Sequence, residues 1–513
     1  MGNKLYCRVL NGLCRRLYSS ELKRFRAPCD VRAVQMKYLT ELLRKNSAAE
    51  YGKKYSFENI RTYSDFAAQV PLTRYEDYEN FIGSIADGAE GVLTMEKVRL
   101  LELTSGSSGG RKLIPYTDSL QREFQRGLRP WIGDIYSNVE QVMQGMSYWS
   151  VTPVTSGKQF TKAGIPIGFE EDSAYFGRLE RHIMDRLFAV DGSIKFADSM
   201  ESFWHDTAVS LLRCPCLTLI SVWNPTYLSI LCRYISDNAE SLAAELPALR
   251  KKDFVEKARS GSFELVFPDV RIISCWADGS AADSVKEVEK LFSGVYIQPK
   301  GIIATECFTS LPLVGESGSR LSIYSHFFEF RSLSDNSIVT ADQLEKGEYE
   351  LIVTTGGGLY RYCIGDIIEV LETYDSAPPR IRFLRRAGNS CDLFGEKLTE
   401  DFVRNVLRKL GISDHFCLLA PEGNRYCLYT DAQGIRNEEL DNAMRESFHY
   451  NYCRQLGQLE CAETVEAAPD ADRLYLKRLT DEGMRLGDIK PSCLSKLSGW
   501  RDYLAKERNE RNA

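Results

Sequence analysis

The chain has 513 residues, 43% hydrophobic and 27% charged, which is enough for two or more domains with a substantial core. Its formal net charge is −6, with both signs spread along the sequence, and no basic segment predicts a nucleic-acid partner. No apolar stretch reaches the roughly 18 residues that a membrane-spanning helix needs, so we expect no transmembrane segment.

The cysteines indicate the compartment. There are fifteen, an odd number, and none forms a C-x-x-C pair. This pattern favours free thiols in a cytoplasmic protein over a disulfide framework. The five histidines are far apart and form no H-E-x-x-H, so a histidine-based zinc site has little support. The basic, amphipathic segment 1–17 is interpreted as a surface helix docked on the domain.

In chain order, residues 1–65 and 118–145 are predicted to be helical, because apolar residues recur at helical spacing. The apolar run 98–103 predicts a buried strand, and the alternation over 111–117 predicts a second one. Residues 176–260 are predicted to be mainly helices. From residue 262 short apolar runs predict strands at 263–267, 270–275, 295–298, 302–305, 327–330, 348–354, 367–370 and 381–384. Helices and strands mixed over nearly 400 residues predict an α/β fold.

A hinge is predicted at 385–389, and a small α+β domain follows it. Its predicted elements are a helix at 399–410, strands at 415–420 and 425–430, a helix at 437–455 and a strand at 459–466. We therefore divide the chain into a large domain, 1–386, and a small domain, 387–513.

The loop Thr104–Lys112, with the sequence TSGSSGGRK, is the most informative segment. Its glycines let backbone N–H groups surround an anion, its serines add donors, and two cations close it, which favours polyphosphate binding. The loop also fits G-x-S-x-G with Ser108 as a nucleophile, but that motif requires a helix directly after the turn, and here a strand is predicted. The Walker A spacing is absent, since Leu113 follows Lys112. A plain polar hairpin turn is the remaining alternative.

Three later residues have the chemistry to complete such a site. Glu306 follows the apolar run 301–303, where a carboxylate could hold Mg²⁺ beside phosphates. Asp366 follows Gly365 and could accept two ribose hydroxyls, although a turn aspartate is an equal alternative. Lys490, in a loop framed by glycine and proline, could stabilise developing negative charge, although most such lysines are solvated.

Six motifs in order resemble one family, the acyl-acid amido synthetases of the plant auxin-responsive Gretchen Hagen type and their bacterial relatives, within the acyl-adenylate-forming superfamily. The resemblance covers nearly the whole chain, and the Lys490 segment, which keeps only Lys-Pro, is closer to bacterial members. The segments that carry it are 75–88, 104–112, 221–225, 305–306, 360–366 and 395–400. The resemblance implies a large adenylate-forming domain and a small mobile domain that carries a catalytic lysine.

The implied reaction has two steps: ATP and a carboxylic acid give an acyl-adenylate and pyrophosphate, and an amine, usually of an amino acid, then displaces AMP. ATP and Mg²⁺ are the implied cofactors, and a monomer is expected. The implied catalytic residues are Lys490 and Glu306, the latter also the metal ligand. The implied nucleotide contacts are Ser105, Ser107, Ser108, Lys112, Thr305, Tyr360, Asp366, Arg386 and Lys397.

One departure concerns adenine. The superfamily often has Tyr four residues before the metal-site glutamate, and this chain has Ile302 there, so adenine must be held by apolar packing or by another ring. Aromatic residues in 120–230 that could line the acyl pocket are Trp149, Trp223 and Tyr227, although such residues are more often plain core. Two other functions stay open, acyl transfer to a CoA or carrier thiol through the same adenylate and, more distantly, a serine esterase using Ser108.

Overall fold

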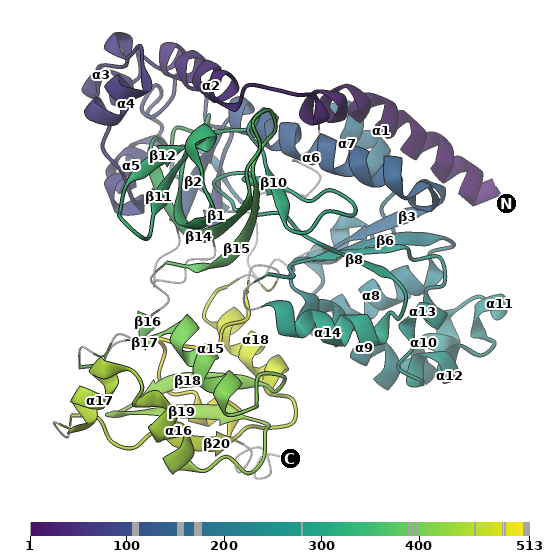
Figure 1. Ribbon diagram of the computed structural model, residues 1–513. Helices are drawn as coiled ribbons and strands as arrows, with labels where there is room; N and C mark the ends of the chain where they lie inside the picture. Colours follow the sequence, from purple (N-terminus) through teal and green to yellow (C-terminus); the bar gives the residue numbers. More distant parts are fainter. Residues whose placement is uncertain are drawn as a thin grey trace. The chain divides into compact units, whose positions relative to one another are not determined.

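The computed structural model (Figure 1) describes residues 2–104, 112–150, 159–168, 177–278, 281–387, 390–391, 393–394, 396, 398–455, 458–484, 486 and 489–505. It divides into two compact units, residues 1–278 with 287–384 and residues 279–286 with 385–513. The functional domains 1–386 and 387–513 stay a prediction.

The first unit begins with helices, as predicted for residues 1–65. They are α1 (Gly2–Arg26), α2 (Val31–Lys45), α3 (Glu50–Lys54), α4 (Tyr63–Gln69) and α5 (Glu79–Ala86). Helix α1 lies along α6 (Asp118–Asn138), as Figure 1 shows. Asn11 of α1 fixes this contact. The side-chain amide of Asn11 donates to the carbonyls of Met143 and Gly145, both at 3.0 Å, and its side-chain oxygen accepts from the Tyr136 hydroxyl at 2.8 Å. The predicted helix 118–145 ends in a 3-10 turn, Glu140–Gln144.

A parallel sheet follows, with the order β3 (Met146–Trp149), β6 (Leu217–Ser221), β7 (Ile272–Cys275) and β8 (Tyr296–Pro299) among the described strands. Consecutive residues of a strand point to opposite faces of the sheet. The contacts of Tyr148 and Trp149, neighbours on β3, therefore identify the helix on each face. The Tyr148 hydroxyl lies 2.7 Å from that of Tyr227 on α9 (Pro225–Asp237), and Trp149 packs edge-on against Trp131 of α6. Helices α6 and α9 therefore cover opposite faces.

Residues 176–260 are mainly helical, as predicted, although strand β6 lies among them. The helices are α7 (Arg178–Met184), α8 (Met200–Arg213), α9, α10 (Ala239–Glu245), α11 (Ala248–Lys251) and α12 (Phe254–Arg259). The predicted strand 263–267 is wrong, because this segment forms helix α13 (Phe263–Val266). Phe263 and Phe267 are buried and Leu265 between them is half exposed, so a four-residue helical spacing buries both rings.

An antiparallel sheet completes the first unit. Among the described strands its order is β12 (Ile338–Thr340), β11 (Phe327–Ser332), β13 (Gly347–Thr354), β14 (Tyr362–Glu372), β15 (Arg380–Arg386), β10 (Ser319–Leu321) and β9 (Ser310–Leu311). A smaller sheet has the order β2 (Lys112–Tyr116), β1 (Leu100–Thr104), β5 (Pro166–Ile167) and β4 (Gln159–Phe160). The α/β fold is thus confirmed.

The second unit is α+β, as predicted. Among the described strands, β16 (Ser390–Cys391) pairs with β17 (Leu398–Thr399). In a second sheet, β19 (Arg425–Thr430) lies between β18 (Cys417–Glu422) and β20 (Glu463–Glu466). Its helices are α15 (Glu400–Lys409), α16 (Asn437–Met444), α17 (Phe448–Gln455), α18 (Ala471–Asp481) and α19 (Arg501–Leu504), and α14 (Ala282–Leu291) begins in it. The predicted helix 437–455 is two helices. All fifteen cysteines carry free thiols, and no described helix is long and apolar enough to cross a membrane.

Candidate functional site

Strands β1 and β2 form an antiparallel hairpin, and this hairpin holds the glycine-rich loop. Their register pairs Thr104 with Lys112, so the two strands flank the whole loop. Ser105, Ser107 and Ser108 lie outside the described residues. A strand follows the loop, and α6 begins only at Asp118. The predicted second strand is confirmed, and in the described part of this segment a strand, and not the helix that a serine nucleophile motif requires, follows the loop.

Strand β2 contacts two other motif segments. The Lys112 ammonium lies 5.3 Å from the centroid of the Tyr75 ring, and the Tyr75 hydroxyl accepts a 2.7 Å hydrogen bond from the backbone of Leu113. At the other end of the strand, the Tyr116 hydroxyl donates to the carbonyl of Thr305 at 3.1 Å. The hairpin thus contacts both the Tyr75 motif and the segment that carries Glu306.

Thr305 and Glu306 form the tip of a tight turn, so the predicted strand 302–305 is wrong. Ala304 and Cys307 exchange backbone hydrogen bonds at 2.9 and 3.3 Å across this tip. The chain turns here because Gly301 approaches the carbonyl of Ser310 so closely that a Cβ atom would lie 2.0 Å from that oxygen. Glu306 is 5% exposed, which places a carboxylate in a largely water-free position.

Asp366 lies in a β-bulge of β14. The ladder with β13 pairs Glu350 with Ile367 but Ile352 with Cys363, so the segment 364–366 bulges out. Gly365 has a φ of +83°, a conformation that glycine adopts without strain. Bulges can re-aim side chains at functional sites, and Asp366, which ends this bulge, is 2% exposed.

Tyr360 lies in the core. Its ring is fully buried, stacked 5.0 Å from Tyr51 and edge-on at 4.9 Å to Phe57, and its hydroxyl donates to the carbonyl of Leu93 at 2.9 Å. Its predicted nucleotide contact stays a prediction, and the contacts of its side chain are those of a core residue. Sequence reasoning could not separate it from its motif neighbours.

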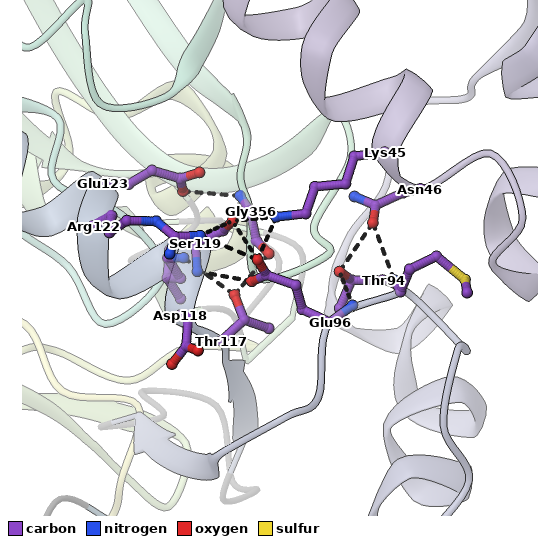
Figure 2. A network of polar contacts seen from close by, with 12 residues as sticks. Lys45, Asn46, Thr94, Glu96, Thr117, Asp118, Ser119, Arg122, Glu123 and Gly356 are labelled. Atoms are coloured by element: carbon purple, nitrogen blue, oxygen red, sulfur yellow. Dashed lines mark hydrogen bonds and ion pairs between the residues drawn. The ribbon is translucent and has the colours of Figure 1, made fainter.

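Figure 2 shows a polar network that ties the glycine run 356–358 to the start of α6. Thr117 donates to the carbonyl of Gly356 at 2.9 Å, and the N–H of Gly356 donates to Glu123 at 2.9 Å. Beside it, Glu96 accepts from Ser119 N–H at 2.8 Å and pairs with Lys45 and, at 3.1 Å, with Arg122. The glycine run is thus fixed beside the hairpin, where a Cβ on Gly357 would lie 2.7 Å from the carbonyl of Pro115.

Lys300 is a residue that sequence reasoning missed. It is 6% exposed, and its ammonium lies 5.1, 5.6 and 4.9 Å from the rings of Trp131, Trp149 and Trp223. Burial lowers the pKa of Lys300 to about 7. The predicted pocket residues Trp149 and Trp223 therefore converge, whereas Tyr227 packs on the opposite face of the sheet through its bond to Tyr148. In the sequence, Lys300 lies between the predicted strands 295–298 and 302–305, and nothing in this pattern indicates that it is buried.

In the second unit, Arg386 ends β15 and Lys490 is half-buried. Lys397 lies outside the described residues. The described part of the chain holds no group of three or more histidine, cysteine, aspartate or glutamate residues suited to a metal. Mg²⁺ needs no such group, because one or two carboxylates with substrate phosphates suffice, and Glu306 fits that requirement.

Comparisons with known proteins agree with this geometry. The GH3 family N-terminal domain matches residues 22–297, and the GH3 family central domain matches residues 320–386. The chain is 24% identical over 428 residues to a putative indole-3-acetic acid-amido synthetase, GH3.10, of Oryza sativa subsp. japonica, covering 78% of this chain and 87% of that protein. It is 24% identical over 454 residues to the indole-3-acetic acid-amido synthetase GH3.2 of Arabidopsis thaliana, covering 78% and 81%.

Solved structures share the fold. The GH3.15 acyl acid amido synthetase in complex with 2,4-DB has a TM-score of 0.77 at 19% identity, covering 94% of each chain. A 2-hydroxyisobutyryl-CoA ligase in the postadenylation state has a TM-score of 0.52 at 12% identity, covering 90% of this chain and 94% of that one. The resemblance drawn from six motifs is thereby confirmed. Because the N-terminal domain match alone spans more than half of the sequence, this chain belongs to the GH3 family.

Proposed function

We propose that the protein is an ATP-dependent acyl-acid amido synthetase. It activates a small carboxylic acid as an acyl-adenylate, with release of pyrophosphate, and transfers the acyl group to the amine of an amino acid, with release of AMP. The activation is needed because a carboxylate is a poor electrophile, and AMP is a far better leaving group than oxide. The names of the relatives, which are acid-amido synthetases, support this reaction.

One observation carries the proposal: three motif segments and the glycine run 356–358 meet around strand β2. Tyr75 contacts Lys112 and Leu113, Tyr116 bonds Thr305, and Gly357 closely approaches Pro115. These contacts place the cation of Lys112 at one end of the strand and the turn with the buried carboxylate of Glu306 at the other. Cations and carboxylates are the groups that a nucleotide triphosphate and its metal require.

The roles of the residues follow from their chemistry. Lys112, with Ser105, Ser107 and Ser108, is proposed to hold phosphates, and Asp366 the ribose hydroxyls. Glu306, beside Thr305, would ligate Mg²⁺, which supplies charge neutralisation at the phosphates when bound. Lys490 is proposed to stabilise the charge that develops in adenylation. The other proposed nucleotide contacts are Arg386 and Lys397.

The setting of the enzyme is also part of the proposal. We place it in the cytoplasm as a monomer, with small molecules as its partners. Its fifteen free thiols support a reducing compartment.

A second candidate uses the same adenylate but a thiol acceptor. The fold shared with a CoA ligase makes acyl transfer to CoA or a carrier the alternative to test. A serine esterase is disfavoured, because the hairpin replaces the strand–turn–helix that exposes a nucleophile.

The deciding experiment is carboxylate-dependent ATP–pyrophosphate exchange over aryl and indolyl acids, fatty acids and amino acids. We expect exchange with one acid class, and its loss by at least a hundredfold in Lys490→Ala and Glu306→Gln, in keeping with the removal of a charge-stabilising group. The acceptor is then identified by discharging the adenylate with amino acids or CoA. Ester hydrolysis without ATP, and no exchange, would refute the proposal.

A further inference from the structure

Polar side chains form a row across the carboxyl ends of the parallel strands. The register pairs Trp149 with Ser221, Ser221 with Ser274, and Ser274 with Gln298. Residues paired in this way point to the same face of a sheet, and the indole N–H of Trp131 on α6 donates to Gln298 at 2.9 Å. The row therefore lies on the face that α6 covers, at the edge where open α/β sheets bind ligands.

Lys300 joins this row. It lies two residues after Gln298, so its side chain shares that face, and its ammonium donates to the Ser221 hydroxyl at 2.6 Å. An ammonium has three hydrogens to donate, and within the described residues Lys300 makes no ion pair with a carboxylate. We call Ser221, Ser274, Gln298 and Lys300 the donor row.

Two further donors of the row are buried without an acceptor among the described residues. They are the side-chain amide nitrogen of Gln298, which is fully buried, and the hydroxyl of Ser274, which is 1% exposed. Buried polar groups in folded proteins are nearly all hydrogen-bonded, and an unpaired buried cation is costly. The two neutral donors, Gln298 and Ser274, thus lack an acceptor, and the cation Lys300 on the same face lacks a negative partner. One anionic acceptor would satisfy all three.

A carboxylate has that chemistry, since its two oxygens accept several hydrogen bonds and its charge matches an ammonium. The three indole rings around Lys300 stabilise the cation through their faces and provide apolar walls for the rest of a ligand. Phosphate is less suitable, because these walls desolvate a second negative charge that the row cannot pair.

We propose that the donor row binds a substrate carboxylate that the reaction does not consume. This inference rests on the proposed function, in which the reacting carboxylate becomes an uncharged mixed anhydride and then an amide. A buried cation paired with that group would lose its partner at the first step, whereas an unreactive carboxylate keeps it throughout. The substrates offer two sources: a second carboxylate on the acid, or the α-carboxylate of the amino acid.

Matched ligand pairs separate these sources. In the acid arm, octanedioate and octanoate are compared by tryptophan fluorescence titration and by pyrophosphate exchange. In the amine arm, phenylalanine and 2-phenylethylamine are compared as acceptors of the acyl group. We expect the member with the additional carboxylate, octanedioate in the acid arm or phenylalanine in the amine arm, to be preferred in one pair by about tenfold to a hundredfold, the range for hydrogen bonds to charged groups.

The variants Lys300→Met and Ser274→Ala should each reduce that preference, the first to near unity and the second by about threefold to tenfold. Ser274→Ala removes only a hydroxyl, so it tests the row without changing its charge or its stability at pH 7 through Lys300. Lys290→Met on the exposed face of α14 is the matched control and should change nothing. A preference that both row variants keep, or no preference in either arm, overturns the inference.

The proposed function and this inference fail in different ways. Carboxylate binding without ATP, together with no exchange for any acid, would refute the amido synthetase and leave the row as an anion site. Exchange with acids, together with equal use of both members in each pair, would support the enzyme and refute the row.

Discussion

Glu123 and His326 form a buried pair, with 3.1 Å between a carboxylate oxygen of Glu123 and Nδ1 of His326. The other ring nitrogen of His326 accepts the N–H of Phe308 at 2.9 Å, so the proton is on Nδ1 and is donated to Glu123. Glu123 also accepts from Gly356 N–H at 2.9 Å and from the Tyr38 hydroxyl at 2.7 Å. The pair therefore ties the turn after Glu306 to the glycine run before Asp366.

Removing this imidazole should loosen both segments. His326→Ala leaves the buried N–H of Phe308 without an acceptor and takes one of two donors from Glu123 Oε2, which still accepts from Gly356. One buried unpaired group costs about 1–3 kcal/mol, so we expect the free energy of unfolding to fall by that amount in urea titrations. His205→Ala, which removes an exposed histidine 2.7 Å from Glu245, should cost less than about 1 kcal/mol. Equal losses in the two variants would contradict the positioning role.

A second buried pair should be as sensitive. The Arg361 guanidinium bonds Glu329 at 2.8 Å and the carbonyls of Ala67 and Val70 at 2.9 and 2.8 Å, and both members of the pair are buried. Arg361→Met leaves Glu329 charged and unpaired, and should lower the free energy of unfolding by about 3–5 kcal/mol. The control Arg436→Met, at an exposed pair with Glu439, should cost about 0–1 kcal/mol.

Asp278 should make stability depend on pH. Burial raises the pKa of Asp278 to about 6, against the pull of Arg382 and the N–H of Phe383. The folded state then holds this proton more tightly than the unfolded state, so stability is lost as pH rises from about 4 to about 6. Asp278→Asn should therefore raise the melting temperature at pH 7 and have little effect at pH 4. A benefit that is the same at both pH values would contradict this assignment.

Asp441 should show the opposite dependence of stability on pH and is the control for Asp278. Hydrogen bonds from Arg454, Arg445, Tyr450 and Ala462 outweigh its burial and lower the pKa of Asp441 to about 2. Its contribution is present above pH 4 and is lost as pH falls toward 2. Asp441→Asn should therefore destabilise the protein at pH 7 and lose this effect in acid.

Gly365 should control the aim of Asp366. Its φ of +83° costs an alanine about 1–2 kcal/mol, and the bulge relaxes by moving its neighbour. Gly365→Ala should raise the KM for ATP in the exchange assay more than the KM for the acid, as the proposed ribose contact requires. Gly411→Ala, at a φ of +71° with open space around it, is the matched control. It should destabilise without changing the ratio of the two KM values.

Lys300 gives a further pH signature. Burial lowers its pKa to about 7, and among the described residues the titratable group that acts on it is Cys275, whose own pKa is raised by burial to about 12. The unfolded state binds this proton more tightly, so stability rises as pH increases from about 7 to about 10. Lys300→Met should therefore stabilise by on the order of 3–5 kcal/mol at pH 7, and the gain should vanish near pH 10. Exposed Lys290→Met should show no such trend.

The protonation of Lys300 should also control the affinity of the donor row for a carboxylate. Affinity for the preferred carboxylate should fall above pH 7, because Lys300 loses its charge there, and should be flat across this range in Lys300→Met. Fluorescence titration at pH 6 and pH 8 checks this. An affinity that rises with pH in the wild type would contradict it.

Motif order was sufficient to predict the family and the α/β class, and strand patterns were sufficient for β11, β13, β15, β18 and β19, because each alternates or clusters apolar residues. Strands β3 and β6 were missed because they carry polar residues: Thr218 and Ser221 are buried and Ser147 is half-buried, which their sequence does not indicate. The strand predicted at 302–305 was wrong for a different reason. Its residues are apolar, but the chain turns there, next to the close approach of Gly301 to Ser310.

The candidate site residues were chosen from local motifs, and the structure adds the long-range packing around them. Glu306 and Asp366 were proposed from their own motifs and their roles stay predictions, while the bulge at 364–366 depends on the partner strand β13. Tyr360 was proposed because it shares a motif with Asp366, and its burial against Tyr51, distant in sequence, could not be seen in that motif. Lys300 gave no signal, since its cage comes from three separate segments.

The hydrogen bonds between Asn11 of α1 and residues 143–145 have a consequence for synthesis on the ribosome. Asn11 leaves the ribosome more than 130 residues before its acceptor carbonyls on Met143 and Gly145. At about 5–20 residues per second, the helix waits roughly 7–27 seconds for its partner. During that interval both its inner face, with Cys14, and its outer apolar residues, such as Val9, are unprotected. The nascent chain thus offers chaperones a binding segment that the finished protein half conceals.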